Sequence, residues 1–196
     1  IQAPAEIGFA SFVFPGIDVA SAALSDVARS GAAEDAYVFD PESTDKSLAN
    51  PDIMADVKTL AAVVQGQSSW RKGLMEGAKL VLSGRSFAKD NMFSLHVVCA
   101  GRSGAAVEAD IEAARAIAQK HGGAEIANSI PKAVRAVPFK PLNGVLGPTG
   151  ERWAAMNAKV PHSEASRVIA AADEIFATYK KRMVAHGVTI SRLLIG

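Results

Sequence analysis

Alternation of side chains in the predicted strands is the feature that most constrains the fold of this chain. Within the segment 92–100, one face is apolar: Phe93, Leu95, Val97 and Cys99. The other face holds Ser94, His96 and Val98. Strands of a doubly wound parallel sheet are buried on both faces and are near-continuous apolar runs, so alternation favours antiparallel pairing. We therefore expect an α+β fold, a mostly antiparallel sheet with helices on one face, built from ferredoxin-like units.

Two β–α–β passages are predicted, near residues 6–40 and 92–128. The first contains a strand (6–14), a helix from Asp18 to Ser30 that stops at Gly31, and a strand (36–40) closed by the turn dipeptide Asp40–Pro41. Residues 42–49 are expected to form a polar loop. In the second passage a turn at 101–104 precedes a helix whose inward stripe is Val107, Ile111, Ala114 and Ala118. A short strand or bend (124–128) and one or two helical turns (129–136) follow.

The rest of the chain is expected to form a helical insert and a C-terminal unit. Two helices are predicted at about 50–86, with Asn50–Pro51 marking the first start. Residues 137–152 are rich in proline and glycine, and the glycine-rich loop 144–152 is expected to be mobile. A strand is predicted at 153–160, a helix at 163–186 and a last strand at 188–195. The helix has an apolar stripe: Val168, Ala172, Ile175, Tyr179 and Met183.

Composition excludes several classes of protein. Of the 196 residues 49% are hydrophobic and 21% are charged, which is typical of a globular chain that buries a core. A formal net charge of +1 argues against a nucleic-acid partner, because phosphate neutralisation requires a basic excess. The single cysteine, Cys99, excludes an internal disulfide and a Cys-based metal site, and we interpret it as a core residue. No apolar run is long enough to span a bilayer.

Common catalytic and metal-binding motifs are absent from the sequence. The turn Gly101–Arg–Ser–Gly104 lacks the spacing of a phosphate-binding loop and is interpreted as a tight β–α turn. The four histidines are scattered without metal-ligand spacing, so no metal site is expected. His96 differs from the other three because it points from mid-strand; both local hydrogen bonding and a functional role stay open for it.

If helices cover the apolar face of the sheet, the opposite face presents polar and aromatic residues. Those expected there are Ser94, His96, Trp153, Asn157, Lys159 and either Ser191 or Arg192. Such a face is expected to meet another surface. One interpretation is a homodimer contact, and the other is a roof over a cofactor held by a different domain.

Three stretches resemble the C-terminal half of FAD-linked oxidases. They are residues 23–31 followed by Tyr37–Pro41, residues 87–98 with Ser94–Leu–His–Val, and Gly150–Glu–Arg–Trp through Pro161–His–Ser. The segment 147–165 resembles the entry to the cap strand of the vanillyl-alcohol oxidase and 4-cresol dehydrogenase type. The HxxGDGNxH motif of the glycolate and D-lactate dehydrogenase branch is absent, which favours the former branch. Family members place a PCMH-type FAD-binding domain before this region, and nothing here corresponds to it.

This resemblance implies that residues 1–196 are a single cap, or substrate-binding, domain of a larger flavoenzyme. Its partners would be the FAD-binding domain of the parent enzyme and a small alcohol, hydroxy acid or para-substituted phenol. FAD would be bound mainly by the other domain, so the isolated chain is predicted to be inactive. The substrate-binding residues would be His96, Trp153, Asn157 and Arg192, while no catalytic residue or flavin-linking histidine of the family can be carried over.

Two other interpretations stay open. The first is a non-catalytic ferredoxin-like binding module that dimerises through its open sheet face, and the second is an intact enzyme. The first residue is not methionine and the last residues are apolar, so we expect a piece of a longer chain. The compartment, substrate, electron acceptor and oligomeric state stay open, with the cytoplasm favoured over the periplasm.

Overall fold

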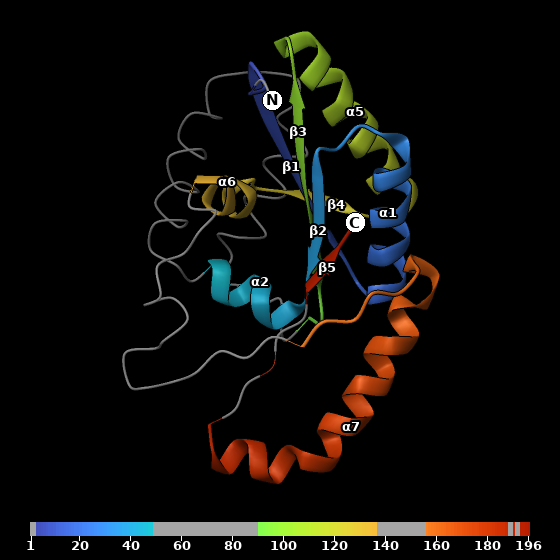
Figure 1. Ribbon diagram of the computed structural model, residues 1–196, viewed down its shortest axis with the longest axis vertical. Helices are drawn as coiled ribbons and strands as arrows, with labels where there is room; N and C mark the ends of the chain where they lie inside the picture. Colours follow the sequence, from blue (N-terminus) through green and yellow to red (C-terminus); the bar gives the residue numbers. More distant parts are fainter. Residues whose placement is uncertain (1–2, 49–89, 137–155, 188–189, 191–192) are drawn as a thin grey trace.

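The computed structural model describes residues 3–48, 90–136, 156–187, 190 and 193–196 and arranges them around a five-stranded sheet (Figure 1). Neighbouring strands are all antiparallel, in the order β4-β1-β3-β2-β5. The strands are β1 (Glu6–Phe14), β2 (Asp35–Phe39), β3 (Phe93–Gly101), β4 (Ala124–Ile126) and β5 (Leu193–Ile195). The antiparallel α+β class predicted from side-chain alternation is confirmed.

Two long helices, α1 (Ile17–Ser30) and α5 (Gly104–Lys120), cover one face of the sheet (Figure 1). The sheet contributes apolar side chains to this layer: Ala10, Phe12, Phe14, Ala36, Val38, Phe93, Leu95, Val97 and Cys99. Helix α5 contributes the predicted stripe, Val107, Ile111, Ala114 and Ala118. The expected buried position of Cys99 is confirmed, and burial followed by the charge of Asp110 raises the pKa of its thiol to about 11. This layer is the main core of the molecule.

Helix α5 lies close against strand β1. At Gly8 of β1, an added Cβ would lie 2.5 Å from both Ile111 Cδ1 and Val107 Cγ1. At the start of the same helix, Ser103 is the N-cap, and its Oγ accepts a hydrogen bond from the Ala106 N–H at 3.3 Å. The turn at residues 101–104 is therefore the β–α connection that the sequence predicts.

Two short helices, α2 (Pro41–Leu48) and α6 (Ser129–Ala136), lie over the opposite face. Helix α2 contacts β2 and β3, α6 contacts β1 and β3, and the two helices touch each other. A smaller apolar cluster forms beneath them: Val13, Ile126, Ala127 and Ile130. The two long helices thus share one face as predicted, and the short ones add cover on the second.

Helix α2 corrects the prediction of a polar loop at residues 42–49. Pro41 occupies the first helical position, where its missing N–H costs nothing. The Asp40 carboxylate accepts a hydrogen bond from the Ser43 N–H at 2.8 Å, as an N-cap does. The dipeptide Asp40–Pro41 therefore starts a helix rather than only closing a strand. No apolar stripe indicates this helix in the sequence, because most of its residues are polar.

Residues 156–187, which precede β5, contribute no strand to the sheet. Residues 156–160 have no regular structure, so the predicted strand 153–160 is wrong in its described portion. The 3-10 turn η2 (His162–Glu164) and helix α7 (Ala165–Ala185) follow, which confirms the helix predicted at 163–186. The Ser21 hydroxyl of α1 donates a hydrogen bond to the His162 carbonyl at 3.2 Å, which ties the start of this helix to the body.

Some predictions fall elsewhere in the chain. The helical insert at about 50–86 and the loop at 144–152 lie outside the described residues. Among the residues that are described, no helix has the length and apolar character needed to cross a membrane.

Candidate functional site

The sheet face beneath α2 and α6 carries a row of polar side chains. Strand register places Tyr37 of β2 opposite His96 of β3, and His96 opposite Ser11 of β1. These three residues point away from the main core because their strand neighbours, such as Leu95 and Phe12, belong to it. His96 and Ser11 are fully buried. The prediction that His96 lies on the face opposite the long helices is thus correct, whereas the expectation of an open face is wrong at this position.

Hydrogen bonds around His96 determine which ring nitrogen carries the proton. The Thr44 hydroxyl donates to the Asp40 carbonyl at 2.9 Å, so its oxygen accepts from the Ser94 hydroxyl at 2.7 Å. Ser94 Oγ, having donated its only proton, accepts from His96 Nε2–H at 2.9 Å. His96 Nδ1 is left as an acceptor for the Ser11 hydroxyl at 3.0 Å. This chain of donors holds the neutral ring with its proton on Nε2.

Burial sets the charge of this histidine as well as its orientation. Complete burial lowers the pKa of His96 to about 3, because the protonated ring would lose its hydration. A ring with so low a pKa is a poor proton acceptor near neutral pH. His96 is therefore suited to orienting its neighbours and not to general base catalysis.

Tyr37 supplies the least satisfied group of the row. Its ring centroid lies 5.4 Å from that of His96 and 5.3 Å from that of Phe39. Its hydroxyl is buried and has no hydrogen-bond partner in the described part of the chain. Burial, and to a lesser degree the charge of Asp35, raises the pKa of Tyr37, so the hydroxyl keeps its proton. The group is therefore a neutral hydrogen-bond donor.

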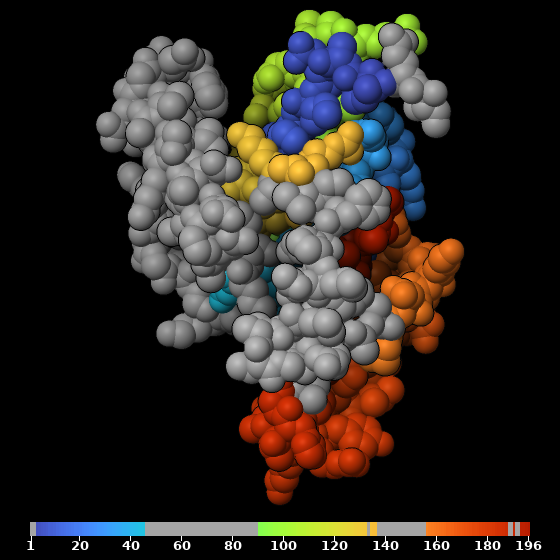
Figure 2. Space-filling model, turned by 60° about the vertical axis from the view of Figure 1, so that its left-hand side comes forward, coloured from blue at the N-terminus to red at the C-terminus, as the bar shows by residue number. Residues whose placement is uncertain are grey.

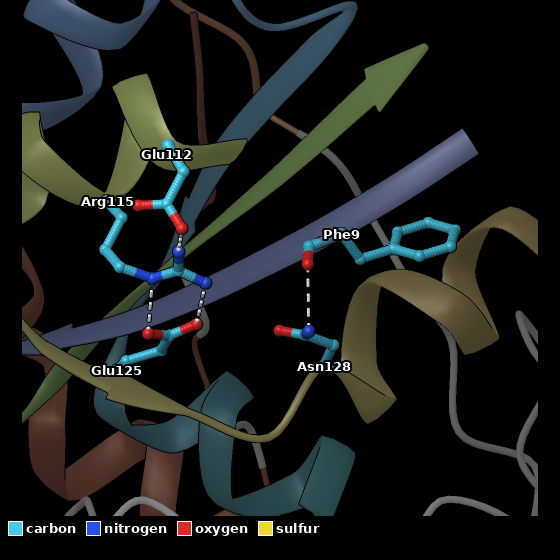
Figure 3. A network of polar contacts seen from close by, with 5 residues as sticks. All are labelled: Phe9, Glu112, Arg115, Glu125 and Asn128. Atoms are coloured by element: carbon cyan, nitrogen blue, oxygen red, sulfur yellow. Dashed lines mark hydrogen bonds and ion pairs between the residues drawn. The ribbon is translucent and has the colours of Figure 1, made fainter. Parts of the chain in front are cut away.

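Two more unpartnered oxygen atoms lie at the start of α6. Asn128 Nδ2 donates to the Phe9 carbonyl of β1 at 2.8 Å (Figure 3). Within the described residues, Asn128 Oδ1 and Ser129 Oγ are buried without a partner. A buried polar group left without a partner costs about 1–3 kcal/mol, so these three groups are unfavourable as they stand among the described residues. We call these residues the polar face: Ser11, Tyr37, Ser94, His96, Asn128 and Ser129.

Other polar clusters in the body are structural. Arg115 of α5 forms a two-pronged ion pair with Glu125 of β4, with Nε–Oε2 at 2.8 Å, and also contacts Glu112 (Figure 3). These bonds hold α5 to the edge strand and raise the pKa of Arg115. On the other side, His121 Nε2 contacts Asp26 Oδ2 at 2.9 Å and lowers the pKa of that carboxylate. No group of three metal-ligating side chains is found among the described residues.

The predicted site residues have different outcomes. His96 lies within the polar face. Asn157 is exposed in irregular backbone rather than on a strand. Trp153 and Arg192 lie outside the described residues. Tyr37, Asn128 and Ser129 were not predicted, although a tyrosine one strand position from an apolar core residue was a usable signal for Tyr37.

Comparison with solved structures finds distant likeness. No protein-family model matches the chain, and no curated protein matches it. Two solved structures of alkyldihydroxyacetonephosphate synthase, in two crystal forms, are similar at TM-score 0.42 with 19% and 17% sequence identity. Each alignment covers 64% of this chain and 20% of the synthase, so the chain corresponds to about a fifth of that protein.

Proposed function

We propose that this chain is the substrate-binding cap domain of an FAD-dependent oxidoreductase. Its substrate is a small alcohol, hydroxy acid or para-substituted phenol, and a separate domain of the parent enzyme binds FAD. The synthase found in the structural comparison belongs to the FAD-linked oxidase family. That likeness is too distant to support the proposal, which rests on the residues of this chain.

The observation that carries the proposal is the polar face. A histidine locked as a neutral tautomer lies beside the ring of Tyr37, whose hydroxyl has no partner among the described residues. Small alcohols and phenols bring a hydroxyl that both donates and accepts a hydrogen bond. The Tyr37 hydroxyl, Asn128 Oδ1 and Ser129 Oγ are groups of the matching kind. By contrast, a module that dimerises through an open sheet face needs exposed side chains, and Ser11, Ser94 and His96 are fully buried.

The described residues do not fit the dinucleotide itself. A pyrophosphate is usually held by free backbone N–H groups at a glycine-rich turn and helix start. At the turn before α5, the Ser103 side chain already bonds the Ala106 N–H. When a flavin is bound by a neighbouring domain, it supplies the hydride chemistry, while residues of this chain orient substrate. Trp153, Asn157 and Arg192 stay proposed substrate contacts.

A first experiment tests whether FAD is bound by another domain and not by this chain. The isolated chain is incubated with FAD, passed through gel filtration and examined for flavin absorbance. We expect no retained flavin, whereas the longest natural chain should retain it and oxidise substrate. Stoichiometric flavin on the isolated chain would contradict the proposal.

A second experiment tests the polar face in the longest natural chain. Tyr37→Phe removes one hydroxyl, and loss of a hydrogen bond of about 1 kcal/mol lowers kcat/KM by roughly fivefold or more. The control is Tyr179→Phe, since Tyr179 is half exposed on α7 and should leave kcat/KM unchanged. Unaltered turnover in Tyr37→Phe, and in alanine variants of Asn157 and Arg192, with the fold intact, would reject the site.

A further inference from the structure

We draw no further inference here: the strongest candidate, the exposed apolar side chains Ile175 and Tyr179 of helix α7, whose red end forms the lower tip of the molecule in Figure 2, is an unpartnered helix face, and nothing in the described part of the chain shows what covers it.

Discussion

Helices α5 and α7 are both long and amphipathic, yet they have opposite relations to the rest of the molecule. Helix α5 buries its whole apolar stripe against β1 and β3, and its first turn is capped by Ser103. Helix α7 buries one residue, and its N-terminus has no side-chain cap. An apolar stripe thus indicates that a helix face needs cover, while the connections of the chain decide whether that cover comes from the same molecule.

The largest expected effect comes from the same substitution made in each helix. Ile111→Ala in α5 removes a side chain that is 9% exposed and should lower the free energy of unfolding by about 2–5 kcal/mol. Ile175→Ala in α7 should change it by less than about 0.5 kcal/mol, because its side chain is mostly exposed. Urea denaturation of the two variants measures both changes. Equal losses would mean that α7 is packed as firmly as α5.

The dependence of stability on pH tests the buried histidine of the sheet. The pKa of His96 falls from an ordinary 6.5 to about 3 on folding, so below about pH 6.5 the unfolded chain binds a proton that the folded chain does not. The free energy of unfolding should therefore fall with decreasing pH by up to about 1.4 kcal/mol per pH unit between pH 6 and pH 4.

Two variants test whether His96 causes this dependence of the free energy of unfolding on pH. His96→Asn should remove this contribution from the pH dependence, measured by urea denaturation at several pH values. The control Ile175→Ala changes a mostly exposed residue of α7 that has no titratable group and should leave the slope as it is. The same slope in the wild type and in His96→Asn would show that His96 does not carry it.

Glycine substitutions test how closely α5 lies on the sheet. Gly8→Ala places a methyl group against Ile111 and Val107 and should cost about 1–3 kcal/mol through overpacking. Gly104→Ala is the control, because nothing lies within 4 Å of its added Cβ. The midpoint temperature of thermal unfolding should therefore be lower for Gly8→Ala than for Gly104→Ala. If Gly8→Ala leaves the stability unchanged, α5 moves away from the strand easily.

The smallest effect concerns the helix starts. Ser103→Ala removes the cap of α5 and should lower stability by about 1 kcal/mol. Glu164→Ala at the start of α7 removes an exposed pair with Arg167 and should cost no more than a few tenths of a kcal/mol. The two losses are compared from the urea concentrations at the midpoint of unfolding, for variants whose free energy of unfolding has the same dependence on urea. A larger loss of stability for Glu164→Ala than for Ser103→Ala would contradict the prediction.

Sequence reasoning succeeded where the local pattern and the tertiary packing agree. The inward residues of α5 and the alternating faces of β3 were predicted correctly because burial on one side imposes a period that is visible in the sequence. It failed at α2, where polar residues form a helix started by Asp40 and Pro41. It also failed at 156–160, where alternation was present but a neighbouring strand was not.

Sequence patterns predicted only part of the candidate site. The alternation of side chains along a strand was enough to place His96 on the correct face, because it depends on the strand alone. Its hydrogen-bond chain depends on segments that arrive from other parts of the sequence, such as α2, whose Thr44 bonds Ser94. No pattern near His96 indicates that Thr44 and Ser11 will orient its ring.

The position of β5 at the edge of the sheet has a consequence for synthesis on the ribosome. Strands β1 to β4 and their helices are complete once Ala136 has emerged, but β2 pairs with β5, which begins at Leu193. At ordinary translation speeds these roughly 57 further residues take about 3–11 s. During that interval the outer edge of β2 is open to the strands of other nascent chains on the same polysome.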